Sequence, residues 1–183
     1  MVNRILYLHG AGDDDGPDDE IARELRAHWP DAEIIAPQLP PTDRPDSAQL
    51  WQHEIARAIR ELPDEPWILV GHSLGGSEAL RFLCLRRPTM LRRTVIVGAP
   101  LWEAPGPGQA HDESHPWWGP AWALPLHADR ALADLDVVIV HSEDDPVVPV
   151  AHAHRLDRML SSARLQIAHR GGHRPVDWIR RAA

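Results

Sequence analysis

A serine between glycines is the residue of this sequence best suited to covalent chemistry. Residues 71–75 read Gly-His-Ser-Leu-Gly, which matches the G-x-S-x-G pattern, and a short apolar run precedes them. On a sharp turn between a strand and a helix, such a serine lifts its hydroxyl clear of the backbone, and its neighbours must be small. The pattern alone is weak, and a tight glycine turn is the plainer interpretation. The setting between a predicted strand and a predicted helix favours Ser73 as a nucleophile.

A serine nucleophile needs a base and a group that orients this base. After a nucleophilic turn of this kind, the acid and then the histidine follow along the chain. Three acidic residues, Glu143, Asp144 and Asp145, come directly after an apolar run in the second half of the sequence. Asp145 is preferred because Pro146 restricts it to an extended or turn conformation, which gives the carboxylate a fixed direction. Asp144 is its rival and Glu143 a more distant one, while a solvated acidic turn is the non-catalytic alternative.

The base is expected after the last predicted strand, at 165–167. His173 follows two glycines in a loop that can turn back over the sheet edge. His169 lies at or near the end of the strand, where packing is the more natural role. The spacing therefore favours His173 over His169.

The oxyanion formed during attack on a carbonyl needs hydrogen-bond donors. One should be the backbone N–H of Leu74, the residue after the nucleophile, and the second should come from the loop after the first strand. Small residues in that loop, at 8–12, let backbone N–H groups approach a substrate oxygen. Ala11 is the preferred second donor and Gly12 the alternative.

Elements that alternate between strand and helix must position these residues. Short apolar runs without alternation are typical of parallel strands that are covered on both faces. Six such runs, separated by amphipathic segments, predict a mostly parallel six-stranded sheet in a three-layer α/β/α sandwich, forming one domain over 1–183. The strands are expected at 5–8, 33–36, 67–70, 94–97, 136–140 and 165–167.

One long segment, at about 100–127, breaks this alternation as a loop insertion rich in tryptophan and proline. Loops of this length are usually functional or disordered, and four tryptophans argue against disorder. Trp117, Trp118 and Trp122 are candidates for an apolar substrate pocket over Ser73. The alternative is that they only pack the loop against the sheet.

The composition excludes several classes of function. All 19 cationic residues are arginine, so lysine chemistry is absent, and the single cysteine, Cys84, allows neither an internal disulfide nor a cysteine zinc site. A net charge of −8 without a basic stripe disfavours nucleic acid as a partner. No apolar run approaches the ~18 residues of a membrane span, and the N-terminus lacks a signal-peptide layout, so we expect a cytoplasmic protein. The histidines at 111 and 115 are spaced as in a zinc-protease motif, but Asp112 stands where that motif has glutamate and Pro116 disfavours a helix, so we expect no metal.

Four motifs together resemble those of the α/β-hydrolase superfamily, and they extend over nearly the whole chain: 8–10, 71–76, 145–149 and 171–173. Within the superfamily, the sequence is similar to small serine hydrolases related to retinoblastoma-binding protein nine. These share its size, a Pro-Trp-rich segment before the acid strand and an Asp-Asp-Pro turn. The resemblance implies a compact α/β-hydrolase fold with Ser73, Asp145 and His173 as a catalytic triad.

The expected function is a carboxylesterase-like serine hydrolase, which forms an acyl-enzyme on Ser73 and requires no cofactor. An acidic run at 13–20 follows the first strand and would repel anionic substrates, so the ester should be small, neutral and partly apolar. Two alternatives remain: an acyltransferase or amidase with the same triad, and a binding protein on a hydrolase scaffold. The expected partner is a small-molecule substrate, and nothing in the sequence indicates a protein partner.

Overall fold

The computed structural model describes residues 4–12, 16–102 and 121–177. Its six strands form one parallel sheet, as predicted, and their order in the sheet is β2-β1-β3-β4-β5-β6. The strands are β1 (Arg4–Leu8), β2 (Glu33–Ile35), β3 (Trp67–His72), β4 (Leu91–Val97), β5 (Val137–Ser142) and β6 (Arg164–Ala168). The helices are α1 (Glu20–His28), α2 (Ser47–Glu61), α3 (Leu74–Leu85), α4 (Ala128–Leu132) and α5 (Ala151–Met159).

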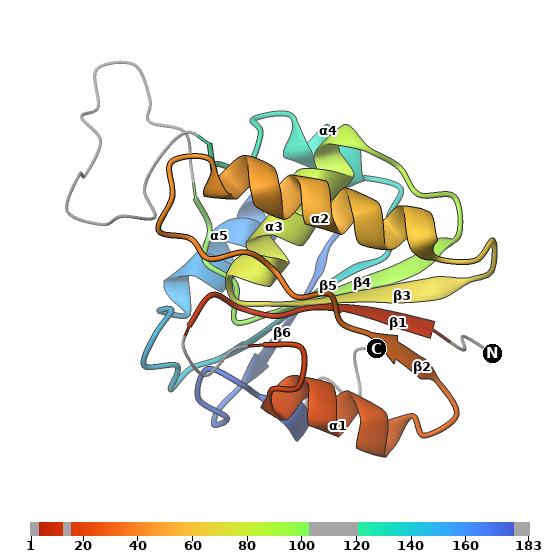
Figure 1. The fold of residues 1–183 in the computed structure, drawn as a ribbon. Coiled ribbons are helices and arrows are strands. Elements are labelled where there is room, and N and C mark those ends of the chain that lie inside the picture. Colours follow the sequence, from red (N-terminus) through yellow and green to blue (C-terminus); the bar gives the residue numbers. More distant parts are fainter. Residues whose placement is uncertain (1–3, 13–15, 103–120, 178–183) are drawn as a thin grey trace.

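Helices cover the sheet on both faces, which gives the three predicted layers (Figure 1). Helix α1 packs against one face, where Ile21 and Leu25 join the inward side chains of β1, β3, β4 and β5. Helices α2 to α5 cover the other face and share a larger core with the opposite side chains of the same strands. Because both faces are covered, strand β5, which lies between β4 and the edge strand β6, is buried along its whole length. The parallel order brings the carboxyl ends of all six strands to one edge.

The structure differs from the sequence prediction mainly around the long loop. Helix α4 was not predicted, because five residues are too few to show a helical period. Most of the predicted insertion lies outside the described residues, as do Trp117, Trp118 and the histidines at 111–115. The described ends of the insertion meet, since the N–H of Leu124 donates to the Trp102 carbonyl at 2.8 Å.

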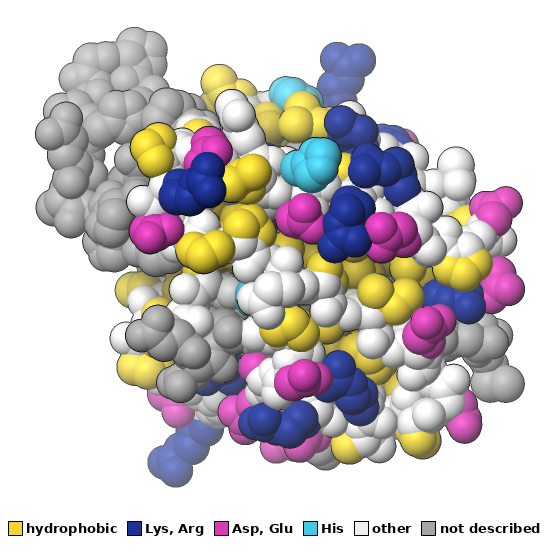
Figure 2. Space-filling view, in the orientation of Figure 1, with side chains coloured by type: hydrophobic (Ala, Val, Ile, Leu, Met, Phe, Trp, Pro, Cys, Tyr) yellow, Lys and Arg dark blue, Asp and Glu magenta, His cyan; other side chains and the backbone are white. Residues whose placement is uncertain are grey.

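Charges on the visible face are mixed in sign. Figure 2 shows acidic and basic side chains interspersed over the region where α2 lies. Within the described residues, no helix has the length and apolar character needed to cross a membrane.

Candidate active site

Ser73 occupies the sharp turn between β3 and α3. Its φ is 51° and its ψ is −124°, and among the described residues it is the only non-glycine residue with a positive φ. The backbone is held there because the Ser73 N–H donates to the Val97 carbonyl at 2.8 Å, so the turn is tied to the end of β4. Strain of this kind in a non-glycine residue costs about 1–3 kcal/mol and is concentrated at functional sites.

A close approach of two backbones sets the position of the turn. A Cβ atom on Gly75 would lie 2.3 Å from the Leu8 carbonyl oxygen and 2.5 Å from that of His9. The first turn of α3 therefore packs directly against the end of β1 and the loop that follows it. This contact brings the two predicted sources of oxyanion donors, Leu74 and the loop with Ala11, to adjacent places.

The start of α3 provides unused donors beside Ser73. The first bonds within the turn run from the N–H groups of Gly76 and Ser77 to the Ser73 carbonyl, at 3.0 and 3.2 Å. The N–H groups of Leu74 and Gly75 come before these bonds and have no carbonyl one turn earlier within the helix. They also lie at the positive end of the helix dipole, which favours a developing negative charge.

The loop after β1 is fixed by His9, a buried residue that the sequence analysis did not single out. Its Nδ1 lies 2.6 Å from the Gly10 carbonyl, which can only accept, so Nδ1 carries a proton. Its Nε2 accepts a hydrogen bond from the Leu39 N–H at 3.1 Å, so this nitrogen carries none. These two contacts assign one neutral tautomer to His9 and connect the loop to the segment after β2.

Asp145 is the buried acid of the site. Its side chain is 0% exposed, and Oδ1 accepts hydrogen bonds from the backbone N–H groups of Val147 and Val148, at 2.8 and 2.9 Å. Oδ2 lies 2.8 Å from Nδ1 of His173 and 3.3 Å from Nε2 of His141. Burial by itself would raise the pKa of Asp145, but hydrogen bonds from the two imidazoles and two N–H groups outweigh it. The pKa of this carboxyl is therefore held well below its usual value, and the group stays ionised.

A second histidine, His141, faces the same carboxylate from the end of β5. Its side chain is fully buried, and Nε2 also lies 2.8 Å from the Val148 carbonyl. Since this carbonyl can only accept, Nε2 carries the proton and is shared between Val148 and Asp145. The Nδ1 atom of His141 has no hydrogen-bond partner among the described residues. The His141 N–H therefore lies between the Val148 carbonyl and the acid, nearer to the carbonyl.

His173 packs over the carboxyl ends of β3 and β4. Its ring centroid lies 4.7 Å from that of His72, and the His72 Nε2 lies 3.1 Å from the His173 carbonyl. Gly98 allows this approach, because a Cβ there would be 2.9 Å from the same carbonyl and 3.2 Å from Nδ1. His72 directly precedes Ser73, and Gly98 directly follows Val97, which binds the Ser73 N–H. His173 is therefore held beside the serine turn, with Nδ1 committed to Asp145 and Nε2 left for other contacts.

The rival candidates lie outside this arrangement. Asp144 accepts hydrogen bonds from the Ser142 hydroxyl at 2.5 Å and the Gly172 N–H at 2.9 Å, so it anchors the loop that carries His173. Glu143 pairs with His169 at 3.0 Å. His169 is 90% exposed, in contrast to the packed role predicted for it.

A hollow of about 580 Å³ opens beside the loop after β1, and we call it the Trp51 pocket. It begins at the residues of that loop and continues over the segment after β2 to helix α2. Its lining residues are His9, Gly10, Ala11, Gly12, Gln38, Leu39, Pro40, Pro41, Thr42, Trp51 and Glu54. Trp122 does not line it; this residue is buried and makes an edge-to-face contact with Trp51, with ring centroids 6.1 Å apart.

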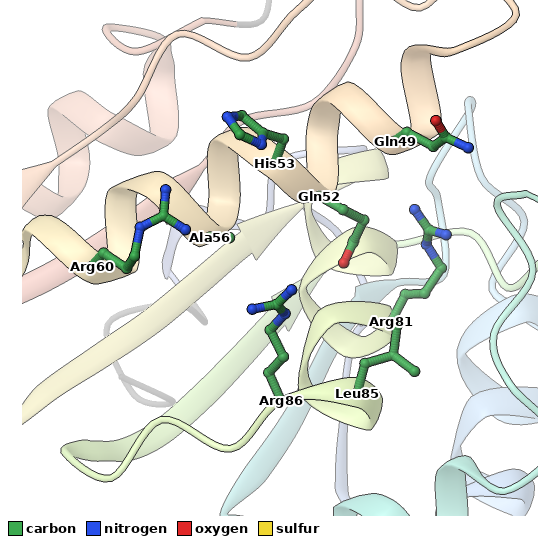
Figure 3. Close-up of a pocket in the computed structure, with 8 residues that line it drawn as sticks. All are labelled: Gln49, Gln52, His53, Ala56, Arg60, Arg81, Leu85 and Arg86. Atoms are coloured by element: carbon green, nitrogen blue, oxygen red, sulfur yellow. The ribbon is translucent and has the colours of Figure 1, made fainter.

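A smaller groove of about 350 Å³ lies between α2 and α3 (Figure 3). Its residues from α2 include Gln52 and Arg60, those from α3 include Arg81, and Arg86 directly follows that helix. Arg81 is committed to the buried Glu78, which also accepts from Gln52 at 2.7 Å. The groove contains none of the residues around Ser73.

Two other kinds of site find no support in the described residues. They contain no group of three His, Cys, Asp or Glu side chains that could hold a metal ion. Burial raises the pKa of the Cys84 thiol to about 11, so it is not activated as a nucleophile.

Sequence reasoning missed three histidines that support the site: His9, His72 and His141. Each stands at or directly after the carboxyl end of a buried strand: β1, β3 and β5. That position is a usable signal, because polar side chains at this edge of a parallel sheet face the ligand site. Their partners, however, come from distant segments and could not be read from the sequence.

The fold of this chain is similar to those of several solved hydrolase structures. The meta-cleavage product hydrolase CumD of Pseudomonas fluorescens IP01 has a TM-score of 0.75 at 18% identity, over 98% of this chain and 88% of that one. An esterase of Exiguobacterium antarcticum gives 0.66 at 16%, over 93% and 85%. Mouse alpha/beta hydrolase domain-containing protein 10 gives 0.68 at 13%, over 98% and 87%. At these identities, the likeness shows the α/β-hydrolase fold.

A comparison with curated protein sequences gives no match. A family profile described as serine hydrolase matches residues 18–178. This match covers most of the chain, including the turn at Ser73, the acidic segment after β5 and the loop that carries His173. The chain belongs to the serine hydrolase family.

Proposed function

We propose that this protein is a carboxylesterase-like hydrolase that cleaves a small, neutral, partly apolar ester through an acyl-enzyme on Ser73. The observation that carries the proposal is the 2.8 Å contact between Asp145 and His173, beside a serine held at a positive φ. An ionised buried acid, an oriented imidazole and a strained serine are the three parts that nucleophilic catalysis by serine requires.

In the proposed mechanism, Asp145 accepts the Nδ1 proton of His173 in a hydrogen bond, so Nε2 holds a lone pair. Nε2 removes the proton of the Ser73 hydroxyl while the oxygen attacks the ester carbonyl. The N–H groups of Leu74 and Ala11 bind the oxyanion, each contributing about 100- to 1000-fold in rate by analogy with other such donors. His173 then gives its proton to the leaving alcohol. In the second half of the reaction, His173 accepts a proton from water as the water attacks the acyl-enzyme, and it returns this proton to the Ser73 oxygen as the acid leaves.

The roles of the supporting histidines follow from their contacts. His141 donates to Asp145 and helps to keep it ionised, whereas His72 contacts the backbone of His173 and fixes its place. Neither lies where it would exchange a proton with substrate, so both are positioning residues.

A cytoplasmic location is part of the proposal, supported by the presence of a single cysteine in the sequence.

The test combines covalent labelling with turnover. A fluorophosphonate probe should label Ser73 in the folded protein, and Ser73→Ala should abolish labelling and the hydrolysis of p-nitrophenyl esters of graded size. Folded protein that neither reacts with the probe nor releases p-nitrophenol would refute the enzymatic proposal and favour a binding protein. Transfer of the acyl group to an added alcohol or amine in preference to water would show that the protein is an acyltransferase rather than a hydrolase.

A further inference from the structure

We infer that the Trp51 pocket receives the acyl chain of the substrate and that Glu54 makes it prefer a cationic end group over an anionic one. The inference rests on the proposed function, because it takes Ser73 as the residue that carries the acyl group. It differs from that function in one respect: the specificity-determining residue Glu54 favours a positively charged acyl chain over the neutral one proposed above.

The pocket lies where the acyl part of the substrate would bind. The hollow begins at residues 9–12, and the same loop packs against the first turn of α3 through the close contact at Gly75. An acyl oxygen bound between Leu74 and Ala11 leaves its chain attached at this loop, where the hollow opens. A volume of about 580 Å³ is within the range of sites for small molecules.

The walls next to the loop suit an alkyl chain. Leu39, Pro40 and Pro41 contribute apolar surface from the segment after β2, and Trp51 contributes its ring from α2. The indole N–H of Trp51 is already committed to the Pro40 carbonyl at 2.7 Å. The ring is therefore held in place beneath the hollow, where only 1% of the residue is exposed.

The side of the pocket formed by α2 carries a negative charge. Among the described residues that line the pocket, Glu54 is the only acidic one and none is an arginine. Its Oε2 accepts from Nε of Arg57 at 2.8 Å, but the same guanidinium also binds Glu61 at 2.9 Å. One cation is thus shared between two carboxylates, which leaves a net charge of −1 on the cluster. With 28% of its side chain exposed and no partner for Oε1 among the described residues, Glu54 can face a ligand.

Electrostatics then decides between acyl groups of equal length. A carboxylate at the end of the chain would face Glu54 with no cation to pair with, whereas an ammonium would complete the charge balance of the cluster. A partly exposed pair is screened by water, so we expect an effect of about tenfold in kcat/KM rather than several orders of magnitude.

The experiment compares three p-nitrophenyl esters of one chain length: hexanoate, 6-(trimethylammonio)hexanoate and the monoester of adipate. The wild-type protein should hydrolyse the cationic ester about tenfold faster than the anionic one, measured as kcat/KM, with the hexanoate between them. In Glu54→Gln the difference should disappear, because the cationic ester slows and the anionic ester accelerates relative to hexanoate. The matched control is Glu65→Gln, which removes the same charge from a carboxylate that likewise shares one arginine, Arg4, with a second glutamate but lies outside the pocket. It should retain the preference.

Two results would overturn the inference. One is a preference that survives in Glu54→Gln, and the other is an equal loss in both variants, which would indicate only the overall charge of the protein. Binding of the corresponding p-nitroanilides to Ser73→Ala separates this inference from the proposed function. A charge preference in binding to Ser73→Ala, together with no turnover by the wild-type protein, would refute the hydrolase and support the pocket. Turnover by the wild-type protein with no charge preference in binding would refute the pocket and support the hydrolase.

Discussion

The neighbouring residues Asp144 and Asp145 allow a sharp test of which acid serves the site. Each can be changed to asparagine, with the same loss of charge and almost no change in volume. The two carboxylates differ in what they bind, so the expected effects differ by orders of magnitude.

In Asp145→Asn, only one of the two acceptor oxygens remains. Oδ1 of the native residue accepts from two backbone N–H groups, and these hold the remaining oxygen on their side. The new amide NH₂ then faces Nδ1 of His173, which must become an acceptor. The imidazole proton moves to Nε2, where it can no longer accept the serine proton. This wrong tautomer lowers kcat by ~10⁴-fold in a dissected triad, equivalent to about 5.5 kcal/mol.

In Asp144→Asn, the bonds that matter can be kept. The Ser142 hydroxyl and the Gly172 N–H both donate to the same oxygen, Oδ1, and an asparagine retains it. The loop that carries His173 therefore stays anchored, and kcat should remain within about threefold of the wild type. The assay is the hydrolysis of p-nitrophenyl butyrate, with the rate of fluorophosphonate labelling as a second readout and circular dichroism as the check of folding. A crippled Asp144→Asn beside an active Asp145→Asn would refute the assignment of the acid.

Three further changes test other contacts. His141→Gln removes the second imidazole from the acid and should lower kcat by about 10- to 100-fold with little change in KM; an unchanged kcat would remove its positioning role. The lowered pKa of Asp145 means that its contribution to stability is fully present above the unfolded-state value of about 3.9 and is lost as the pH falls below it. Asp145→Asn should therefore flatten the acid limb of urea-denaturation midpoints plotted against pH, and an identical limb in both proteins would contradict this reasoning. Burial raises the pKa of Glu78, and its counter-ion Arg81 has only 15% of its side chain exposed. Arg81→Ala should therefore lower the free energy of unfolding in urea by about 3–5 kcal/mol, and a negligible loss would show that the pair is solvated.

The layered fold could be predicted because each strand is a short apolar run that needs cover on both faces. The positions of Ser73, Asp145 and His173 could be derived for a related reason. Each follows a strand, and parallel strands end at one edge, so residues far apart in the sequence meet there. Their catalytic roles stay predictions until the serine is labelled.

The remaining features depend on contacts between segments that no local pattern reveals. The Leu39 N–H, 30 positions away in the chain, donates to His9. Trp122, 71 positions away, makes an edge-to-face contact with Trp51. The pocket predicted at Trp117 and Trp118 lies outside the described residues and stays a prediction. The described hollow is lined by Pro40 and Pro41 after β2, which no sequence pattern marked as part of a site.

The position of β6 at the edge of the sheet has a consequence for how the protein loses function. His173 is attached to a strand with one neighbour, whereas Ser73 follows a central strand with two. Edge elements open by local fluctuations at a smaller free energy than the whole domain requires. If the proposed mechanism holds, activity therefore depends on the pairing of β5 with β6 rather than on global unfolding. A protein that retains most of its secondary structure can still have released His173.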